Sequence, residues 1–262
     1  MNESPIRVPF LLYFSLFLQL VGQLLYAFSN GGPIGSLLFL ETSASDNFSY
    51  YSDHFLVIFC LSFALFGHFL KKISWPLAPF LYSFFFSTSI FFLHSSFAYS
   101  FVFICHGARI ALPLAIFFIL KKKKGHDIIL KIALALTFIG HGSEAIMSHP
   151  QFIDYLINTS LELIHFPLSE ESSRSILFFI GMSDIVLGII CLMAPNSKCY
   201  FIMAFWGGIT SLLRVLYHGD IGYSMFLMRS SHFLIPFYLA NVENKKKTSL
   251  PFFQKVYPYE NI

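Results

Sequence analysis

Ionisable side chains that could carry protons are set inside an apolar run of this chain. The stretch TFIGHGSEAIMSHP, Thr137–Pro150, contains His141 and Glu144 three residues apart, which places both on one face of a helix, and Thr137 and Ser148 extend this stripe. Histidine suits proton transfer because its imidazole gains and loses a proton near neutral pH. An ionisable group inside a bilayer costs roughly 2.5–3.5 kcal/mol even on lenient insertion scales. We therefore expect His141 and Glu144 to pair and to face protein rather than lipid.

Further ionisable residues occur in other apolar runs, where Asp184 shares a helical face with Gly181 and Gly188. We predict that the catalytic, proton-carrying residues are His141, Glu144 and Asp184. The predicted ligand-binding residues are His106, Arg109, Arg214, His218, Arg229 and His232. A surplus of arginine beside histidine suits an anionic or carbonyl-bearing ligand, because guanidinium stays charged and presents forked donors. The alternative is that these residues form structural ion pairs between helices.

The composition indicates which elements must position these residues. Of 262 residues, 56% are hydrophobic, 19% aromatic and only 12% charged, whereas soluble domains carry about 25% charged residues. Lipid-facing helices can carry the 34 phenylalanines, because hydrocarbon tails are as apolar as these side chains. The formal charge of +3 points to neither a nucleic-acid partner nor an acidic substrate. The predicted fold class is an all-α, polytopic membrane helix bundle whose partner is the lipid bilayer.

Eight apolar runs are long enough to cross a hydrocarbon core, which needs about 20 residues each. They are Val8–Phe28, Phe55–Leu70, Pro76–Leu93, Phe97–Leu120, Ile128–Met147, Ser175–Met193, Tyr200–Tyr217 and Tyr223–Ala240. We interpret the first run as a retained helix rather than a signal peptide, since its apolar core exceeds the roughly 7–15 residues of a signal.

Basic residues set the orientation of these spans. With eight spans, one side of the membrane carries Arg7, Lys71–Lys72, Lys121–Lys124, Lys198 and Lys245–Lys247. Cytoplasmic loops are enriched in lysine and arginine. We therefore predict an integral protein of a bacterial inner membrane, with both termini in the cytoplasm and the polar site facing outward.

The second half of the chain resembles the first half. Leu20–Gln23 aligns with Phe138–His141, and His94–Ser100 aligns with His218–Ser224. The pattern H-x-x-R-x-x-x-P at 106–113 meets R-x-x-H-x-x-x-P at 229–236, with the basic types exchanged. We predict two tandem four-helix halves in one orientation, 1–124 and 125–247, followed by a cytoplasmic tail, 248–262.

The later of two wide outer loops is predicted to contain an interfacial amphipathic helix. Its apolar residues follow helical spacing and are Phe152, Tyr155, Leu156, Leu161 and Ile164. Such a helix would lie on the membrane or across the mouth of the bundle.

Bound haem or metal is not favoured by the histidine pattern. His218 and His232 are fourteen residues apart, like paired axial haem ligands, but a predicted turn at 219–222 separates them. A cluster of His94, His141, His149 and His218 at the outer rim contains neither an i,i+4 pair nor an HExxH motif. The four cysteines form no CxxC pair, so neither a disulfide framework nor a zinc site is indicated.

The four-helix unit, its small loops and the R-x-x-H-x-x-x-P ending of the last span resemble the DoxX-like membrane proteins. The resemblance covers Ile128–Ala240 best, and the first half only through the repeat. It implies four-span bundles, a link to quinone as cofactor, and other membrane redox subunits as partners. This chain departs from the family in being twice as long and in carrying His141 together with Glu144.

Three functions remain open from the sequence. In the first, a redox or quinone-associated protein, the arginines hold a carbonyl or anionic group while His141, Glu144 and Asp184 carry protons. In the second, a transporter of a small solute or anion, two halves rock about a site at their interface. No span is broken by adjacent Gly and Pro in both halves, which counts against transport. The third is a membrane assembly subunit without chemistry.

Overall fold

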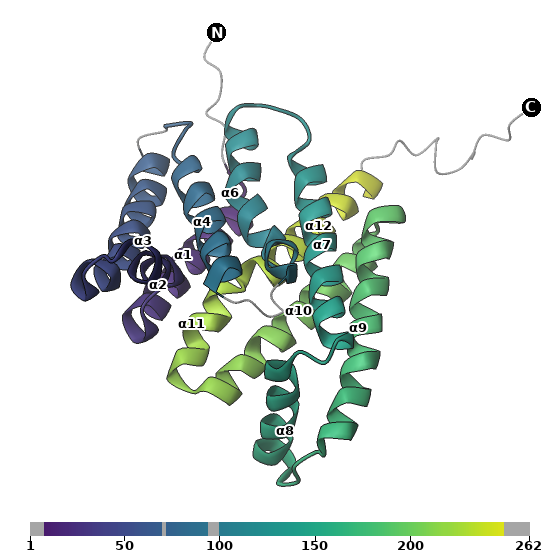
Figure 1. Cartoon of the computed structure of the whole chain (residues 1–262). Helices are drawn as coiled ribbons and strands as arrows, with labels where there is room; N and C mark the ends of the chain where they lie inside the picture. Colours follow the sequence, from purple (N-terminus) through teal and green to yellow (C-terminus); the bar gives the residue numbers. More distant parts are fainter. Residues whose placement is uncertain (1–7, 70–71, 94–99, 249–262) are drawn as a thin grey trace, which may run out of the picture.

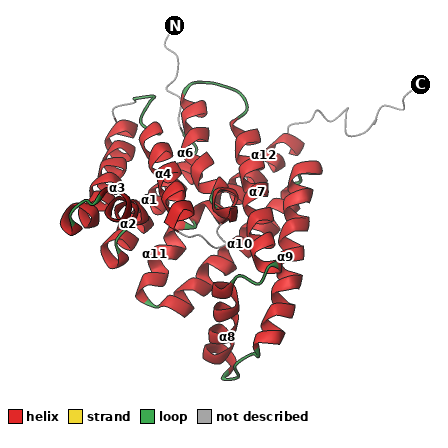
Figure 2. Cartoon of the chain, in the orientation of Figure 1, coloured by secondary structure: helices red, strands yellow, loops and turns green. Residues whose placement is uncertain are grey.

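Helices alone make up the regular structure of the described residues, numbered 8–69, 72–93 and 100–248, in a computed structural model (Figure 2). Five of them are long and apolar enough to cross a membrane. They are α1 (Phe10–Asn30), α3 (Asp46–Phe69), α7 (His126–Ile146), α9 (Glu170–Met193) and α10 (Ser197–His218). Shorter apolar helices are α4 (Leu77–Leu93) and α6 (Gly107–Leu120).

Five of the eight predicted spans thus coincide with long helices, and α4 coincides with the third span. α3 begins nine residues earlier than predicted, at Asp46 rather than Phe55, because an acidic residue in the first turn suits the helix dipole. The predicted residue His94 and the predicted tail from residue 249 onward lie outside the described residues.

The fourth and eighth predicted spans are each interrupted at one residue. α5 (Val102–Cys105) precedes α6, with His106 between them at φ −90°, ψ 2°. α11 (Asp220–Met228) precedes α12 (Ser230–Thr248), with Arg229 between them at φ −92°, ψ 8°. Both residues adopt the bridge conformation that ends a helical turn and is frequent in functional residues. The structure therefore divides two spans that the sequence pattern predicts as continuous.

A proline follows each interruption by seven residues and frees a backbone carbonyl one turn before it. Pro113 leaves the carbonyl of Arg109 to accept a hydrogen bond from Gln19 Nε2, at 3.3 Å. Pro236 leaves the carbonyl of His232, against which Gly207 packs so closely that an added Cβ would lie 2.5 Å from its oxygen. The neighbouring helices are thereby fixed against the interrupted ones.

Two short helices lie outside the spans, α2 (Pro33–Thr42) and α8 (Pro150–Ile164). The sequence predicts α8 but not α2. α8 buries Ile153 against Ala145 and Leu177, with Phe152 and Leu156 packed beside them. The helix therefore covers one end of the α7–α9 pair (Figure 1).

The element order is the same in both halves of the chain: a long helix, a short one, two more helices and an interrupted helix. The packing follows the same rule. α1 packs on α11 and α12, just as α7 packs on α5 and α6, and the two interrupted helices meet where α6 contacts α12. The division into halves at residues 124 and 125 stays a prediction, with which this arrangement agrees.

Close backbone contact joins α7 to α9. A Cβ added at Gly142 would lie 2.6 Å from the carbonyl oxygen of Gly181, and one at Gly188 would lie 2.8 Å from that of Ala135. These glycines therefore let the two helix backbones approach closely. Large apolar side chains cover the outside, including Phe179 at 71% exposure, as expected of lipid-facing helices.

The lysine-rich connection between α6 and α7, residues 121–125, lies at the opposite end of the bundle from α8 (Figure 1). α7 runs from that connection toward α8, and His141 lies about 22 Å along it at ~1.5 Å per residue. The polar stripe therefore lies in the half of the bundle nearer α8. Ser148 is an exception to the predicted stripe, because α7 ends at Ile146 and Ser148 occupies a turn with φ 55°.

Candidate functional site

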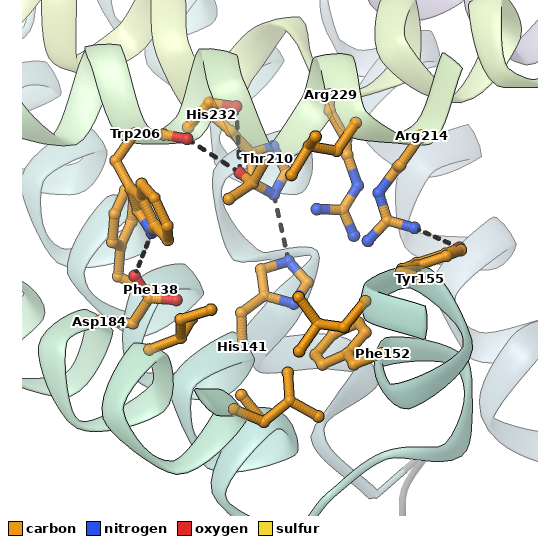
Figure 3. A pocket seen from close by; sticks show the side chains of 16 residues that line it. Phe138, His141, Phe152, Tyr155, Asp184, Trp206, Thr210, Arg214, Arg229 and His232 are labelled. Atoms are coloured by element: carbon orange, nitrogen blue, oxygen red, sulfur yellow. Dashed lines mark hydrogen bonds between the residues drawn. The ribbon is translucent and has the colours of Figure 1, made fainter. Parts of the chain in front are cut away.

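Two adjoining cavities contain most of the buried ionisable side chains. The first, here called the arginine cavity, has a volume of about 340 Å³ and is lined by Arg109, Arg214, Arg229, His106, His141 and Glu144 among others. The second, here called the apolar pocket, has a volume of about 130 Å³ (Figure 3). His141, Phe152, Arg214 and Arg229 line both, so the two spaces share a wall.

Three arginines reach the arginine cavity from three different elements. Arg109 lies on α6, Arg214 on α10, and Arg229 at the interruption between α11 and α12. None of the three has a carboxylate oxygen within 4.0 Å among the described residues. The buried Nε atoms of Arg109 and Arg214 have no hydrogen-bond partner in that part of the chain either. The cavity therefore carries excess positive charge.

His141 lies at the centre of a chain of polar contacts. Its Nδ1 is 3.0 Å from Glu144 Oε2, and its Nε2 is 3.4 Å from Nε2 of His232 on α12. The predicted pairing of His141 with Glu144 is confirmed. The Glu144 carboxylate can accept a proton from one nitrogen of the His141 ring, and the His232 imidazole lies at the other nitrogen. This series of contacts could therefore pass a proton from α12 to α7.

Cys105 on α5 adds a soft ligand beside this chain. Its Sγ and the ligand atoms of His141 and Glu144 all lie within 4.8 Å of one another. Thiolate, imidazole and carboxylate are the ligands that zinc uses, so these three residues could hold a metal ion. The positive charges of the three nearby arginines would repel a metal cation at this position.

Asp184 and Trp206 form a separate polar contact in the apolar pocket. Trp206 Nε1 on α10 donates a hydrogen bond of 2.7 Å to Asp184 Oδ1 on α9 (Figure 3). Asp184 is 8% exposed. The indole thus gives one carboxylate oxygen of Asp184 a hydrogen-bond donor, and Asp184 also lines the apolar pocket.

The short helix α8 is tied to the cavity wall by Tyr155. Arg214 Nη1 donates a 2.8 Å hydrogen bond to the Tyr155 hydroxyl, and the guanidinium carbon lies 4.9 Å from the ring centroid. The same hydroxyl lies 2.9 Å from Nε2 of His218. Tyr155 therefore links α8 to one of the three arginines.

The structure brings together most of the predicted site residues. Six of the nine line the arginine cavity, and Asp184 and His232 line the apolar pocket, which makes eight. His218 is not among the lining residues that the structure describes, and it contacts the site through Tyr155. The predicted His106 is held by Ser87, whose Oγ lies 2.8 Å from His106 Nδ1.

Sequence reasoning missed Tyr155, Trp206, Cys105 and Gln19 as neighbours of the site. The sequence pattern places Tyr155 in an amphipathic helix, and it shows Cys105 only as one of four cysteines without a CxxC pair. One signal was present for Gln19, an amide within an apolar run, because a buried amide needs a hydrogen-bond partner. Gln19 Nε2 donates to Ser83 Oγ at 3.1 Å.

The fold and the buried charges define an integral membrane protein made of helices, with an apolar surface that contacts the lipid bilayer. The comparisons do not refine this class: no family model, no curated protein and no solved structure matches the chain. The resemblance to DoxX-like proteins therefore stays a prediction.

Proposed function

We propose that this protein binds a small anion in the arginine cavity and carries it across the membrane. The observation behind the proposal is that Arg109, Arg214 and Arg229 line one cavity without a carboxylate in ion-pair range among the described residues. Like charges held in a medium of low polarity repel each other, and a bound anion removes that repulsion. Guanidinium groups bind carboxylates and phosphates with two parallel hydrogen bonds.

The two interrupted helices favour transport over simple binding. His106 and Arg229, the interrupting residues, both line the arginine cavity. Many transporters place their substrate beside discontinuous helices at the junction of two repeats. A transporter helix can also be interrupted without adjacent Gly and Pro residues, because each interruption here is a single residue in the bridge conformation. The absence of Gly-Pro pairs from the spans therefore does not count against transport.

The predicted orientation gives the cavity a side of the membrane. With the lysine-rich connection between α6 and α7 in the cytoplasm, the cavity lies in the outer half of the bilayer and α8 lies at its outer mouth. In this arrangement both termini are cytoplasmic, and the membrane is the inner membrane of a bacterium.

Anion-dependent stabilisation of the purified full-length chain tests the binding step. Phosphate, sulfate and acetate are added at constant ionic strength with chloride as reference, and the midpoint of thermal unfolding is measured in detergent. An anion at 100 times its Kd stabilises by about 2.7 kcal/mol. We expect one of them to raise the midpoint, and Arg109→Gln to remove the effect.

The matched control is Arg174→Gln, because Arg174 is exposed and pairs with Glu170 at 2.6 Å, away from both cavities. This variant keeps the anion effect. Uptake of the stabilising anion into proteoliposomes then tests transport, and Arg109→Gln abolishes it. Equal behaviour of chloride and of every other anion, in the unmodified protein, contradicts the proposal.

A redox role beside quinone is the second candidate, and the contact chain from Glu144 through His141 to His232 favours it. In that role the arginines hold the quinone carbonyl, His141, Glu144 and Asp184 carry protons, and other membrane redox subunits supply or accept electrons. Quinone that co-purifies with the chain, and that Glu144→Gln releases, supports this candidate. If the protein binds neither an anion nor quinone, both candidates fail and the third function, a membrane assembly subunit without chemistry, is the one left.

A further inference from the structure

The apolar pocket gives the site a second half that a small hydrophilic anion would leave unused. Its wall beyond the shared residues contains Phe138 on α7, Leu177 and Ile180 on α9, and Leu213 on α10. Arg214 and Arg229 stand at one end of this wall (Figure 3). Charged donors therefore meet an apolar wall inside one continuous site.

The same two helices face lipid beside the pocket. Leu177 on α9 and Leu213 on α10 line the pocket, whereas their chain neighbours Phe178 and Leu212 are 48% and 54% exposed on the apolar surface. One helical face thus serves the pocket and the adjacent face serves the bilayer.

We infer that the ligand is an amphiphilic anion, a single apolar chain that ends in a carboxylate or phosphate. The head binds at Arg214 and Arg229, and the chain lies in the apolar pocket beside Trp206. This inference rests on the proposed anion site and adds the substrate class. Two observations carry it. Among the described residues, no carboxylate oxygen lies within ion-pair range of the arginines, and one wall of the adjoining pocket is formed by the apolar side chains of Phe138, Leu177, Ile180 and Leu213.

Chain length then decides affinity. Each methylene moved from water into an apolar site improves binding by about fourfold. Hexanoate should therefore bind roughly 15-fold more tightly than butyrate, and acetate should bind more weakly than either, because a pocket of about 130 Å³ holds only a short chain. An uncharged chain such as hexanol lacks the head that the arginines hold, and it should bind weakly at any length.

Trp206 provides a local readout, because it lines the pocket. The chain has two tryptophans, and the other, Trp75, is 2% exposed and packs against Tyr13 in the first half. Bromine quenches tryptophan fluorescence on contact. The full-length protein in detergent is titrated with 6-bromohexanoate, and 6-bromohexanol serves as the control for partition into the micelle.

We expect saturable quenching by 6-bromohexanoate that hexanoate reverses, and no saturable quenching by the alcohol. Trp206→Phe removes the saturable signal. Arg214→Gln weakens binding at least tenfold, while Arg174→Gln leaves it unchanged. These results together place the head at the arginines and the chain at Trp206.

Three results overturn the inference: equal quenching by acid and alcohol, quenching that persists in Trp206→Phe, or equal affinity for acetate and hexanoate. If acetate or phosphate still stabilises the protein in the thermal test, the anion site stands and only the amphiphile fails. If no anion of any length binds, the proposed function fails as well.

Discussion

Replacing Arg229 by glutamine separates a functional charge from a structural one. The guanidinium of Arg229 has no hydrogen bond or ion pair with any residue that the structure describes. Arg109 and Arg214 line the same cavity with like charge, and Glu144 lines it with opposite charge. Removing the charge therefore removes two repulsions and one attraction while breaking no described polar contact.

The balance of these terms gives the expected magnitude. A cavity of about 340 Å³ is roughly 9 Å across, and unit charges at that separation interact by about 2 kcal/mol at an effective dielectric constant of ~20, which suits a cavity open to water. Two repulsions less one attraction leave a gain of about 2 kcal/mol. The shorter side chain gives up about 1 kcal/mol of apolar burial of the arginine stem. The ligand-free variant should therefore be more stable by about 1 kcal/mol, a rise of about 2–4 °C in the midpoint of unfolding.

Thermal unfolding of the ligand-free and anion-loaded protein measures both halves of this expectation. Arg229→Gln should raise the ligand-free midpoint and lose most of the anion effect, whereas Arg229→Lys keeps the charge and much of that effect. Arg174→Gln should alter the ligand-free stability by under about 1 kcal/mol, as exposed ion pairs do, with the anion effect intact. A ligand-free loss of about 2 kcal/mol or more in Arg229→Gln would refute the reasoning, because it would mean that the arginine stabilises the fold.

Three further predictions concern packing, the α8 contact and topology. Gly181→Ala should destabilise the protein by about 1–3 kcal/mol in thermal unfolding, since the new Cβ would lie 2.5 Å from the carbonyl oxygen of the facing glycine on α7. Gly208→Ala is the control and should be neutral, because the nearest atom to its Cβ would be 3.9 Å away. Tyr155→Phe removes the hydroxyl that binds the arginine on α10 and should raise hydrogen exchange across α8 while the exchange of α7 stays constant. Lys123→Cys and Asn158→Cys should react with impermeant thiol reagents from opposite sides of the membrane. The background should be low because the four native cysteines are buried. Labelling of both positions from the same side would contradict the predicted orientation.

Local pattern in the sequence was sufficient for the features that depend on one helix at a time. Apolar length gives the long helices, because a bilayer leaves a helix as the one single-segment structure that satisfies its own backbone. Helical spacing gives the contact between His141 and Glu144, since residues three apart lie on adjacent turns. The same spacing predicts α8 from its apolar stripe.

Features that join separate helices required the structure. Nothing in the spacing of Arg109, Arg214 and Arg229 states that three elements bring them to one cavity, because their approach depends on how α6, α10 and α12 pack. The link from Tyr155 to Arg214 likewise joins residues 59 positions apart.

The sequence by itself determined the membrane class, most of the spans and the identity of the ionisable residues, since composition and helical period are local properties. The tertiary structure decided that His106 and Arg229 interrupt two spans, because one bridge-region residue changes a helix direction without changing its apolar pattern. It also decided that unpaired arginines adjoin an apolar pocket. Charge balance and cavity shape are sums over neighbours in space, and the order of residues along the chain does not contain them.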